Sequence, residues 1–147
     1  MIEWKHNSTA ISELPEDVFG FIYRLTFVDK AGTQFYYVGK KNKIKETKLP
    51  ALKNGEQRPN STRVGKNKNG KRVYYDIVRK EDWLDYEGSF DKPEDLTLVY
   101  REVLHFSKSK RNLTYSEVKY QFIRGVLENE NYLNKNILGS FYGPIQE

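Results

Sequence analysis

Two tyrosines stand in neighbouring apolar runs of the chain, Tyr23 at the end of the triplet FIY and Tyr37 at the start of the triplet YVG. A phenol alone is a poor base, because its pKa is about 10. Beside a divalent cation and cationic side chains the pKa can fall, and the phenolate can then accept a proton. Tyrosine also forms strands well, and most of the 11 tyrosines of the chain must serve packing. The pair is therefore either strand filling or part of a site that acts on a substrate.

The elements that hold these tyrosines are predicted to form a β-hairpin. Residues 20–28 and 34–39 are rich in β-branched and aromatic residues, and the polar residues 29–33 favour a turn. Residues 98–105 predict a third core strand, with even-numbered residues on one side and odd-numbered residues on the other. Residues 112–129 carry apolar residues at helical spacing and predict a helix. Its apolar stripe is expected to contain Tyr115, Val118, Phe122, Ile123 and Val126.

Thr114 and Glu117 have the spacing of a capping box, in which the two side chains satisfy backbone N–H groups at the start of a helix. This pattern places Glu117 in the first helical turn, near the surface. A capping role and a chemical role are both compatible with that position.

The remaining segments have weaker patterns. We expect an irregular lead-in over residues 1–17, a helical turn ending at Gly88, and a loop-like tail over residues 132–143.

Positive charge is concentrated between residues 40 and 80, which hold 14 Lys or Arg against 3 acids, while the remainder holds 11 against 17. A basic segment on an acidic body attracts polyanions such as duplex DNA, although a solvated lysine-rich loop is the alternative. Asn69-Gly70 between two β-compatible arms predicts a hairpin within this segment, and residues 44–54 hold a short helical turn at best. The residues expected to contact DNA are Lys40, Arg63, Lys66, Lys68, Lys71, Arg72 and Arg79.

In its order of elements the sequence resembles the GIY-YIG nuclease family. Ile22-Tyr23 and the YVG triplet match the two signature triplets, Glu117 stands where the family carries its metal-binding glutamate, and Asn134 stands near the family's terminal asparagine. The stretches YVGKK, EDWLDYEGS and LTYSEVKYQF with YLNKNILGSFY resemble small endonucleases of this family that large phages encode, many of them homing-type. The resemblance covers roughly residues 20 to 142.

The resemblance implies an α+β fold, with a central, mainly antiparallel three-stranded sheet flanked by helices and a basic hairpin or loop inserted at about 40–80. It implies one domain over residues 1–147 that hydrolyses DNA phosphodiesters with Mg²⁺ or Mn²⁺. Tyr23 would be the general base, Tyr37 would orient water or phosphate, and Glu117 would be the single protein ligand of the metal. Asn134 would brace the site, with Asn136 as the open second choice.

The sequence differs from the family at the cationic residue that binds the phosphate. The family carries an arginine soon after its second triplet, but here no arginine occurs between Gly39 and Arg58. Lys40 and Lys41 follow the triplet directly, and we place Lys41 in the catalytic set, with Arg63, Arg72 and Arg79 as further candidates. The helix that covers the sheet before the third strand also looks shortened or absent. Either the basic insertion or self-association would then complete the core.

Composition limits the other functions. The chain has no cysteine, which excludes disulfides, thiolate metal sites and cysteine nucleophiles. No apolar run approaches the roughly 18 residues of a membrane-spanning helix, so we expect a cytoplasmic protein without a membrane partner, in the host cell if a phage encodes it.

The alternatives to a nuclease are a non-catalytic nucleic-acid-binding protein and a protein-interaction domain. Because one active site cuts one strand, a double-strand break requires a homodimer on DNA or sequential turnover. Trp83 and Tyr86 are expected to anchor the basic segment to the core.

Overall fold

The computed structural model describes residues 1–49, 63–66, 70, 72–75, 77–139 and 141–144, with the side chains of 63–66 and 72–75 left out. The chain divides into two compact units, Met1–Lys43 with Asp82–Glu147, and Ile44–Glu81. The second unit nearly coincides with the predicted basic insertion. The assignment of the whole chain to one domain stays a prediction. Among the described residues no helix is long and apolar enough to cross a membrane.

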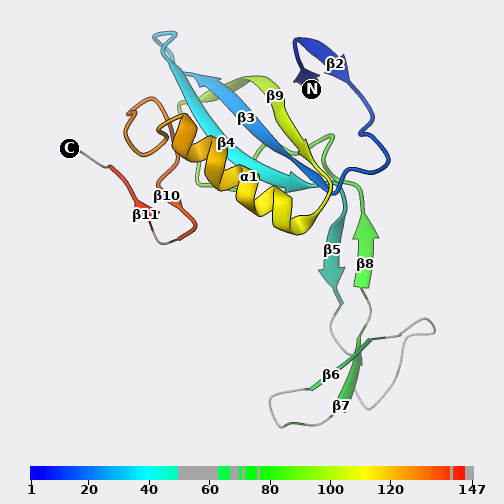
Figure 1. Ribbon diagram of the computed structural model, residues 1–147. Coiled ribbons are helices and arrows are strands. Elements are labelled where there is room, and N and C mark those ends of the chain that lie inside the picture. Colours follow the sequence, from blue (N-terminus) through cyan, green and yellow to red (C-terminus); the bar gives the residue numbers. More distant parts are fainter. Residues whose placement is uncertain (50–62, 67–69, 71, 76, 140, 145–147) are drawn as a thin grey trace. The chain divides into compact units, whose positions relative to one another are not determined.

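The first unit is built on a five-stranded sheet with the order β2-β1-β9-β3-β4 (Figure 1). Strand β3 (Gly20–Val28) pairs antiparallel with β4 (Gln34–Asn42) and, on its other side, with β9 (Thr97–Ser107). In the turn between β3 and β4, the carboxylate of Asp29 accepts the backbone N–H groups of Ala31 and Thr33, each at 2.9 Å. The hairpin, the third strand and the α+β class are thus confirmed.

The N-terminal residues extend this sheet, so the prediction of an irregular lead-in was wrong. Strand β1 (Trp4–His6) runs parallel to β9, and β2 (Thr9–Ile11) pairs antiparallel with β1. Trp4 is buried and donates its indole N–H to the carbonyl of Trp83 at 2.8 Å. The sheet is therefore mixed and has two strands more than the three expected, because burial of one large side chain fixes a segment whose sequence has little strand pattern.

Two irregularities interrupt the pairing of β9 with β3. The partner of Thr26 is Tyr100 and the partner of Phe27 is Leu98, so β9 has an extra residue there, and a second shift lies between Ile22 and Tyr23. Each bulge moves the following side chains to the other face of the sheet. Leu98 and Val103 consequently pack in the same core layer, so the imperfect alternation of the sequence, read as an even-numbered and an odd-numbered side, was wrong across the bulges.

The helix α1 (Lys110–Ile123) lies against one face of the sheet, over β3, β4 and β9 (Figure 1). It begins earlier than predicted, because the side chain of Ser109 accepts the N–H of Asn112 as the N-cap. Thr114 donates its hydroxyl to the carbonyl of Lys110 one turn back, so the predicted capping box was wrong and Glu117 lies in the second turn.

The apolar stripe predicted for this helix was also largely wrong. Tyr115 and Ile123 are each 70% exposed and Phe122 is 52% exposed. Val118 does pack against the core, while Val126 is buried beyond the end of the helix. The buried residues of α1 are Leu113, Ser116 and Gln121, of which two are polar.

The sheet carries a core layer on each face. One layer contains Trp4, Phe21, Tyr23, Leu25, Phe27, Trp83 and Val103, and the other contains Ile22, Val38, Leu113, Val126, Leu127 and Ile137. Residues 82–96 pack on the first layer without a helix, so the predicted helical turn ending at Gly88 was wrong. This loop and Trp4 fill the place of the expected covering helix, and neither the insertion nor a second copy is needed to bury this layer.

The second unit consists of paired strands. Strand β6 (Arg63–Lys66) pairs antiparallel with β7 (Arg72–Tyr75), which confirms the hairpin around Asn69-Gly70. Strand β5 (Lys45–Lys48) pairs with β8 (Ile77–Lys80). Strand β5 lies in residues 44–54, for which the sequence had suggested a short helical turn at best. In the first unit, the tail forms the short pair β10 (Asn136–Ile137) and β11 (Phe141–Tyr142).

Candidate active site

Tyr23 and Tyr37 lie on the same face of the β3–β4 hairpin, with ring centroids 6.3 Å apart. Tyr23 is paired with Gly39, and Tyr37 is two residues before this glycine on the same strand. A Cβ atom at Gly39 would lie 2.6 Å from the hydroxyl oxygen of Tyr23 and 2.9 Å from the ring of Tyr37. The glycine is therefore required because the two rings occupy the space that any other side chain would need.

The site is placed at the free edge of β4, the last strand of the sheet. Val38 donates its N–H to the side-chain oxygen of Asn134 at 3.1 Å, and its carbonyl accepts the side-chain amides of Asn134 at 2.8 Å and Gln121 at 3.1 Å. Two residues further along the strand, the carboxylate of Glu117 accepts a hydrogen bond from the backbone of Lys40. Side chains from α1 and the following segment thus satisfy an edge that would otherwise be open to pairing.

Electrostatics connect Glu117 to both phenols. Burial raises the pKa of Tyr23 well above its usual value, with smaller contributions from Tyr86, Tyr37 and Glu117. Burial and then the charge of Glu117 raise the pKa of Tyr37 to about 12. Burial also raises the pKa of Glu117, against the effect of Lys40. The acid therefore lies within electrostatic reach of both rings, and a cation at this place would oppose every one of these shifts.

The residues present fit a metal ion that is held mainly by water and substrate. Within the described part of the chain, no group of three or more His, Cys, Asp or Glu side chains could hold a metal ion. Glu117 offers one carboxylate. Mg²⁺ commonly keeps several waters and binds through one or two carboxylates together with substrate phosphates. A one-carboxylate site suits that ion, whereas it would be inadequate for a closed structural metal centre.

The two lysines after the triplet differ in their surroundings. The ammonium of Lys41 lies 2.6 Å from a carboxylate oxygen of Asp82 and 4.8 Å from the ring centroid of Tyr86, on the same side as the phenols. Lys40 directs its ammonium to the hydroxyl of Thr114 on α1 at 3.2 Å. Lys41 is therefore the cation of the predicted set that lies beside the phenol cluster.

The other predicted DNA contacts belong to the second unit, which is described by itself. Arg79 forms an ion pair with Glu46 at 2.9 Å. Arg63, Lys66 and Arg72 lie on strands β6 and β7, with side chains outside the described set. Lys68 and Lys71 fall outside the described residues altogether.

Asn134 and Asn136 are clearly separated by burial. Asn134 is buried and holds both backbone groups of Val38, whereas Asn136 is exposed on β10. Asn134 and Tyr37 both line a small cavity of about 120 Å³, together with Phe90, whose ring stacks on Tyr37 at 3.9 Å. The cavity has room for more than one water molecule beside the phenol.

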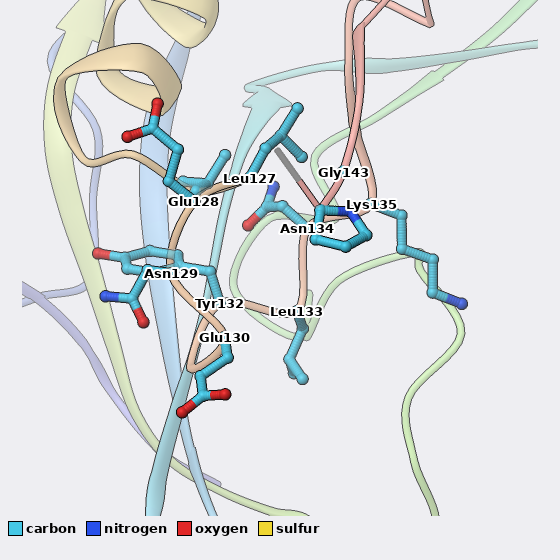
Figure 2. A pocket seen from close by; sticks show the side chains of 11 residues that line it. Leu127, Glu128, Asn129, Glu130, Tyr132, Leu133, Asn134, Lys135 and Gly143 are labelled. Carbon is cyan, nitrogen blue, oxygen red and sulfur yellow. The ribbon is translucent and has the colours of Figure 1, made fainter. Parts of the chain in front are cut away.

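A larger cavity of about 900 Å³ lies on the tail side of Asn134 (Figure 2). Its lining includes Glu128 and Glu130 and one basic side chain, Lys135. Two carboxylates and a single cation are a poor match for a polyanion, so this cavity does not suit the predicted DNA substrate.

Sequence reasoning missed two residues that contact the site. The hydroxyl of Tyr86 lies 3.3 Å from that of Tyr23, and the amide of Gln121 binds the carbonyl of Val38. Trp83 and Tyr86, expected to hold the basic segment, pack on the phenol-bearing face of the sheet. The only signal for Tyr86 was its place within the EDWLDYEGS stretch, and Gln121 had none, because it is a polar residue outside the predicted apolar stripe of the helix.

Comparison with protein-family models gives a match over residues 4–137 to a family described as "Putative endonuclease segE, GIY-YIG domain". Comparison with curated proteins and with solved structures gives no match.

Proposed function

The chain belongs to the GIY-YIG nuclease family, and on that basis we propose that it is a Mg²⁺-dependent DNA endonuclease, able to use Mn²⁺, that hydrolyses phosphodiester bonds. The observation that supports this most directly is the arrangement at the edge of β4. There Tyr23 of β3 and Tyr37 of β4 lie on one face of the hairpin, while Glu117 and Asn134 bind backbone groups of β4.

Each of these residues has a chemical role in the proposal. Glu117 would hold the metal ion, which when bound supplies positive charge against the negative charge that develops on the phosphate. Tyr23 accepts a proton from the attacking water, and Tyr37 orients that water or the phosphate by hydrogen bonding. Asn134 fixes the YVG segment through Val38. Lys41 supplies the nearby fixed cation in place of the family's arginine.

The raised pKa of Tyr23 restricts when it can act as a base. At neutral pH the resting protein holds a neutral phenol there, because burial disfavours the phenolate. Proton acceptance would therefore depend on the positive charge of the metal ion that Glu117 would hold, since the DNA phosphate itself brings negative charge. This makes hydrolysis conditional on a complete complex.

We further propose that the basic segment holds the duplex, mostly through phosphates, which set position and affinity rather than sequence choice. The resemblance to small phage-encoded endonucleases supports a homing-type enzyme acting in the cytoplasm of the host cell. Two copies on one DNA molecule would allow a double-strand break.

The experiment is nicking of supercoiled plasmid with and without Mg²⁺, comparing wild type with Glu117→Gln and Tyr23→Phe. Both variants should lose nicking while DNA binding persists. Glu128→Gln and Tyr36→Phe are matched controls, since the first residue is exposed after α1 and the second hydroxyl binds Gln34. Nicking that survives both test substitutions would remove this site from the mechanism.

A second candidate function is a nucleic-acid-binding protein that keeps the nuclease scaffold without activity. The absence of an arginine between Gly39 and Arg58 motivates it, because lysine cannot form arginine's bidentate bond to phosphate. Binding of duplex DNA without Mg²⁺-dependent cleavage by the wild type would favour this candidate. The salt dependence of binding cannot separate the two, because both predict it.

A further inference from the structure

We propose that Tyr86 is a positioning residue for the reaction, which holds the hydroxyl of Tyr23 in place through a hydrogen bond. This inference rests on the proposed function. It adds a third phenol, from the loop before β9, to the two that the signature triplets provide.

The hydroxyl groups of three residues form a short chain. The oxygen of Tyr86 lies 3.3 Å from that of Tyr23 and 3.2 Å from that of Ser89, which is exposed. A hydroxyl can donate one hydrogen bond while it accepts another. Tyr86 can therefore accept from Ser89 and donate to Tyr23, and that donor would stabilise negative charge on the oxygen of Tyr23. Tyr23 is only 2% exposed, so the bond from Tyr86 meets little competition from bulk solvent.

The loop that carries Tyr86 is fixed by buried side chains rather than by secondary structure. Arg101 donates from one guanidinium nitrogen to the carbonyls of Leu84 and Tyr86, each at 2.8 Å, and Trp4 donates to the carbonyl of Trp83. Arg101 is 1% exposed. Burying a guanidinium is costly unless its hydrogen bonds are made, so its use on two carbonyls of one loop defines the position of that loop closely.

A cation lies over the face of the Tyr86 ring. The ammonium of Lys41 lies 4.8 Å from the ring centroid, and Asp82 in the same loop binds this ammonium. The rings of Tyr86 and Tyr23 meet edge to face at 5.6 Å. A cation over a phenol ring withdraws electron density from it and makes its O–H a better donor. The cation over the Tyr86 ring thus favours donation from Tyr86 toward Tyr23.

The test is Tyr86→Phe, which keeps the ring and removes only the hydroxyl. We expect kcat for plasmid nicking to fall about tenfold with KM unchanged, the size expected for loss of one hydrogen bond to a developing charge. If Tyr86 donates to Tyr23, loss of its hydroxyl should move the pH profile of kcat to higher pH, because the phenolate of Tyr23 loses a donor. A move to lower pH would show that Tyr86 only raises the pKa of Tyr23, as an acceptor of its proton, and would overturn the inference. The other titratable groups that face Tyr23 are Tyr37 on β4 and Glu117 on α1, and both remain in the variant. Tyr36→Phe is the control, since it removes a tyrosine hydroxyl of β4 that binds Gln34.

Unchanged kcat and pH profile in Tyr86→Phe would overturn the inference, and so would a rise in KM alone, which would indicate a DNA contact. If Tyr86→Phe does not fold, Ser89→Ala keeps Tyr86 and removes its outer partner, and a smaller fall in kcat is expected. If the wild type does not cleave DNA, the proposed function fails on its own. The inference is then tested by carbon-13 NMR of tyrosine-labelled, metal-free protein. The Tyr23 resonance, assigned with Tyr23→Phe, must move in Tyr86→Phe and stay unmoved in Tyr36→Phe, and the opposite result refutes the contact.

Discussion

Gly39 carries no chemistry, yet the positions of both phenols depend on it. Its missing side chain lets the hydroxyl of Tyr23 and the ring of Tyr37 lie directly over the strand. A triplet that ends in glycine is therefore a packing requirement of the site as much as a family signature. Its partner across the hairpin is the same tyrosine that occupies its space.

Gly39→Ala tests this requirement. The added Cβ would lie 2.6 Å from the hydroxyl oxygen of Tyr23, so the ring must move or the strand must deform. We expect a loss of about 1–3 kcal/mol in the free energy of unfolding, as for other overpacked cores. Cleavage should fall far more than this stability loss explains, because the phenols leave their positions. Urea unfolding and plasmid nicking measure the two effects.

Gly32→Ala is the control, since Gly32 lies in the β3–β4 turn with a φ of +83°, and a Cβ atom there would have no neighbour within 4 Å. It should lower stability by roughly 1 kcal/mol through backbone strain while cleavage by the folded protein is unaffected. Equal losses of activity in the two variants would contradict a specific role for Gly39.

Stability at alkaline pH should report the burial of Tyr37. Its pKa is raised to about 12 in the folded protein against 10.0 without the fold, so the unfolded chain releases this proton first as the pH rises. The free energy of unfolding should therefore decline from pH 10 to about 12, and the same holds in direction for Tyr23. In Tyr37→Phe the decline should be shallower, as followed by urea unfolding across this range.

Glu117→Gln provides an independent check on the same measurement. The charge of Glu117 is the second cause of the raised pKa of Tyr37, after burial. Removing that charge should bring the pKa of Tyr37 closer to its usual value and reduce the decline, although less than Tyr37→Phe does. An unchanged slope in both variants would mean that Tyr37 is not buried as described.

At the scale of elements, the edge of β4 explains why α1 and the tail are placed where they are. Gln121 from the helix and Asn134 from the tail meet at the carbonyl of Val38. Beside them, Tyr36 and Tyr132 form an isolated parallel bridge, in which Leu133 donates its N–H to the carbonyl of Tyr36. The site is therefore assembled by closure of a sheet edge. A single residue, Val38, receives hydrogen bonds from both of the elements that complete it.

Asn134→Asp tests whether the edge of β4 needs both hydrogen bonds of the Asn134 amide or only a polar side chain at this position. Aspartate can still accept the N–H of Val38, but it cannot donate to the carbonyl and places a charge against it. We expect a loss of about 2–3 kcal/mol in the free energy of unfolding, the cost of an unsatisfied buried group, and loss of cleavage. Asn136→Asp on the exposed strand β10 is the matched control and should change stability by less than about 0.5 kcal/mol. If the two variants behave alike in urea unfolding, Asn134 does not hold the edge.

The elements that the sequence predicted well are those with a local signal. The hairpin with Tyr23 and Tyr37 has two apolar runs and a turn, and Asn69-Gly70 marks the second hairpin. The start of α1 was misplaced because Ser109 and Thr114 are both suitable caps, and only the packing of Leu113 on the sheet selects the first. Gln121, Tyr86 and Trp4 could not be predicted, since their roles depend on partners distant in sequence.

For the molecule as a whole, charge and core are divided between the two units. Residues 44–81 hold 11 Lys or Arg against 4 Asp or Glu, so the remaining residues, with 14 against 16, carry a slight negative net charge. None of the buried core side chains of the described residues comes from 44–81. Among the described residues, the buried core and the candidate site lie in the first unit, whereas the net positive charge of the sequence lies in the second.

This division predicts the result of removing the second unit. Replacing residues 44–81 with a short Gly-Ser linker should leave a folded protein, since both core layers remain. Binding of duplex DNA should weaken about tenfold or more, and the dependence of log K on log salt should become shallower by about 0.9 for each phosphate that the protein no longer neutralises. Circular dichroism and fluorescence anisotropy at several salt concentrations measure the two outcomes.

The deletion removes both the segment and its positive charge. A variant with Lys66→Gln and Arg72→Gln keeps the segment and removes two cations, so it tests the contribution of charge alone. Its salt dependence should lie between those of the wild type and the deletion. The deletion protein should also retain the hydrogen bond between Tyr23 and Tyr86, because both lie in the first unit. Weak residual nicking at low salt is therefore expected, with the deficit appearing in KM rather than kcat. If the deletion protein binds DNA as tightly as the wild type, the first unit alone holds the substrate, and the basic segment must serve another purpose.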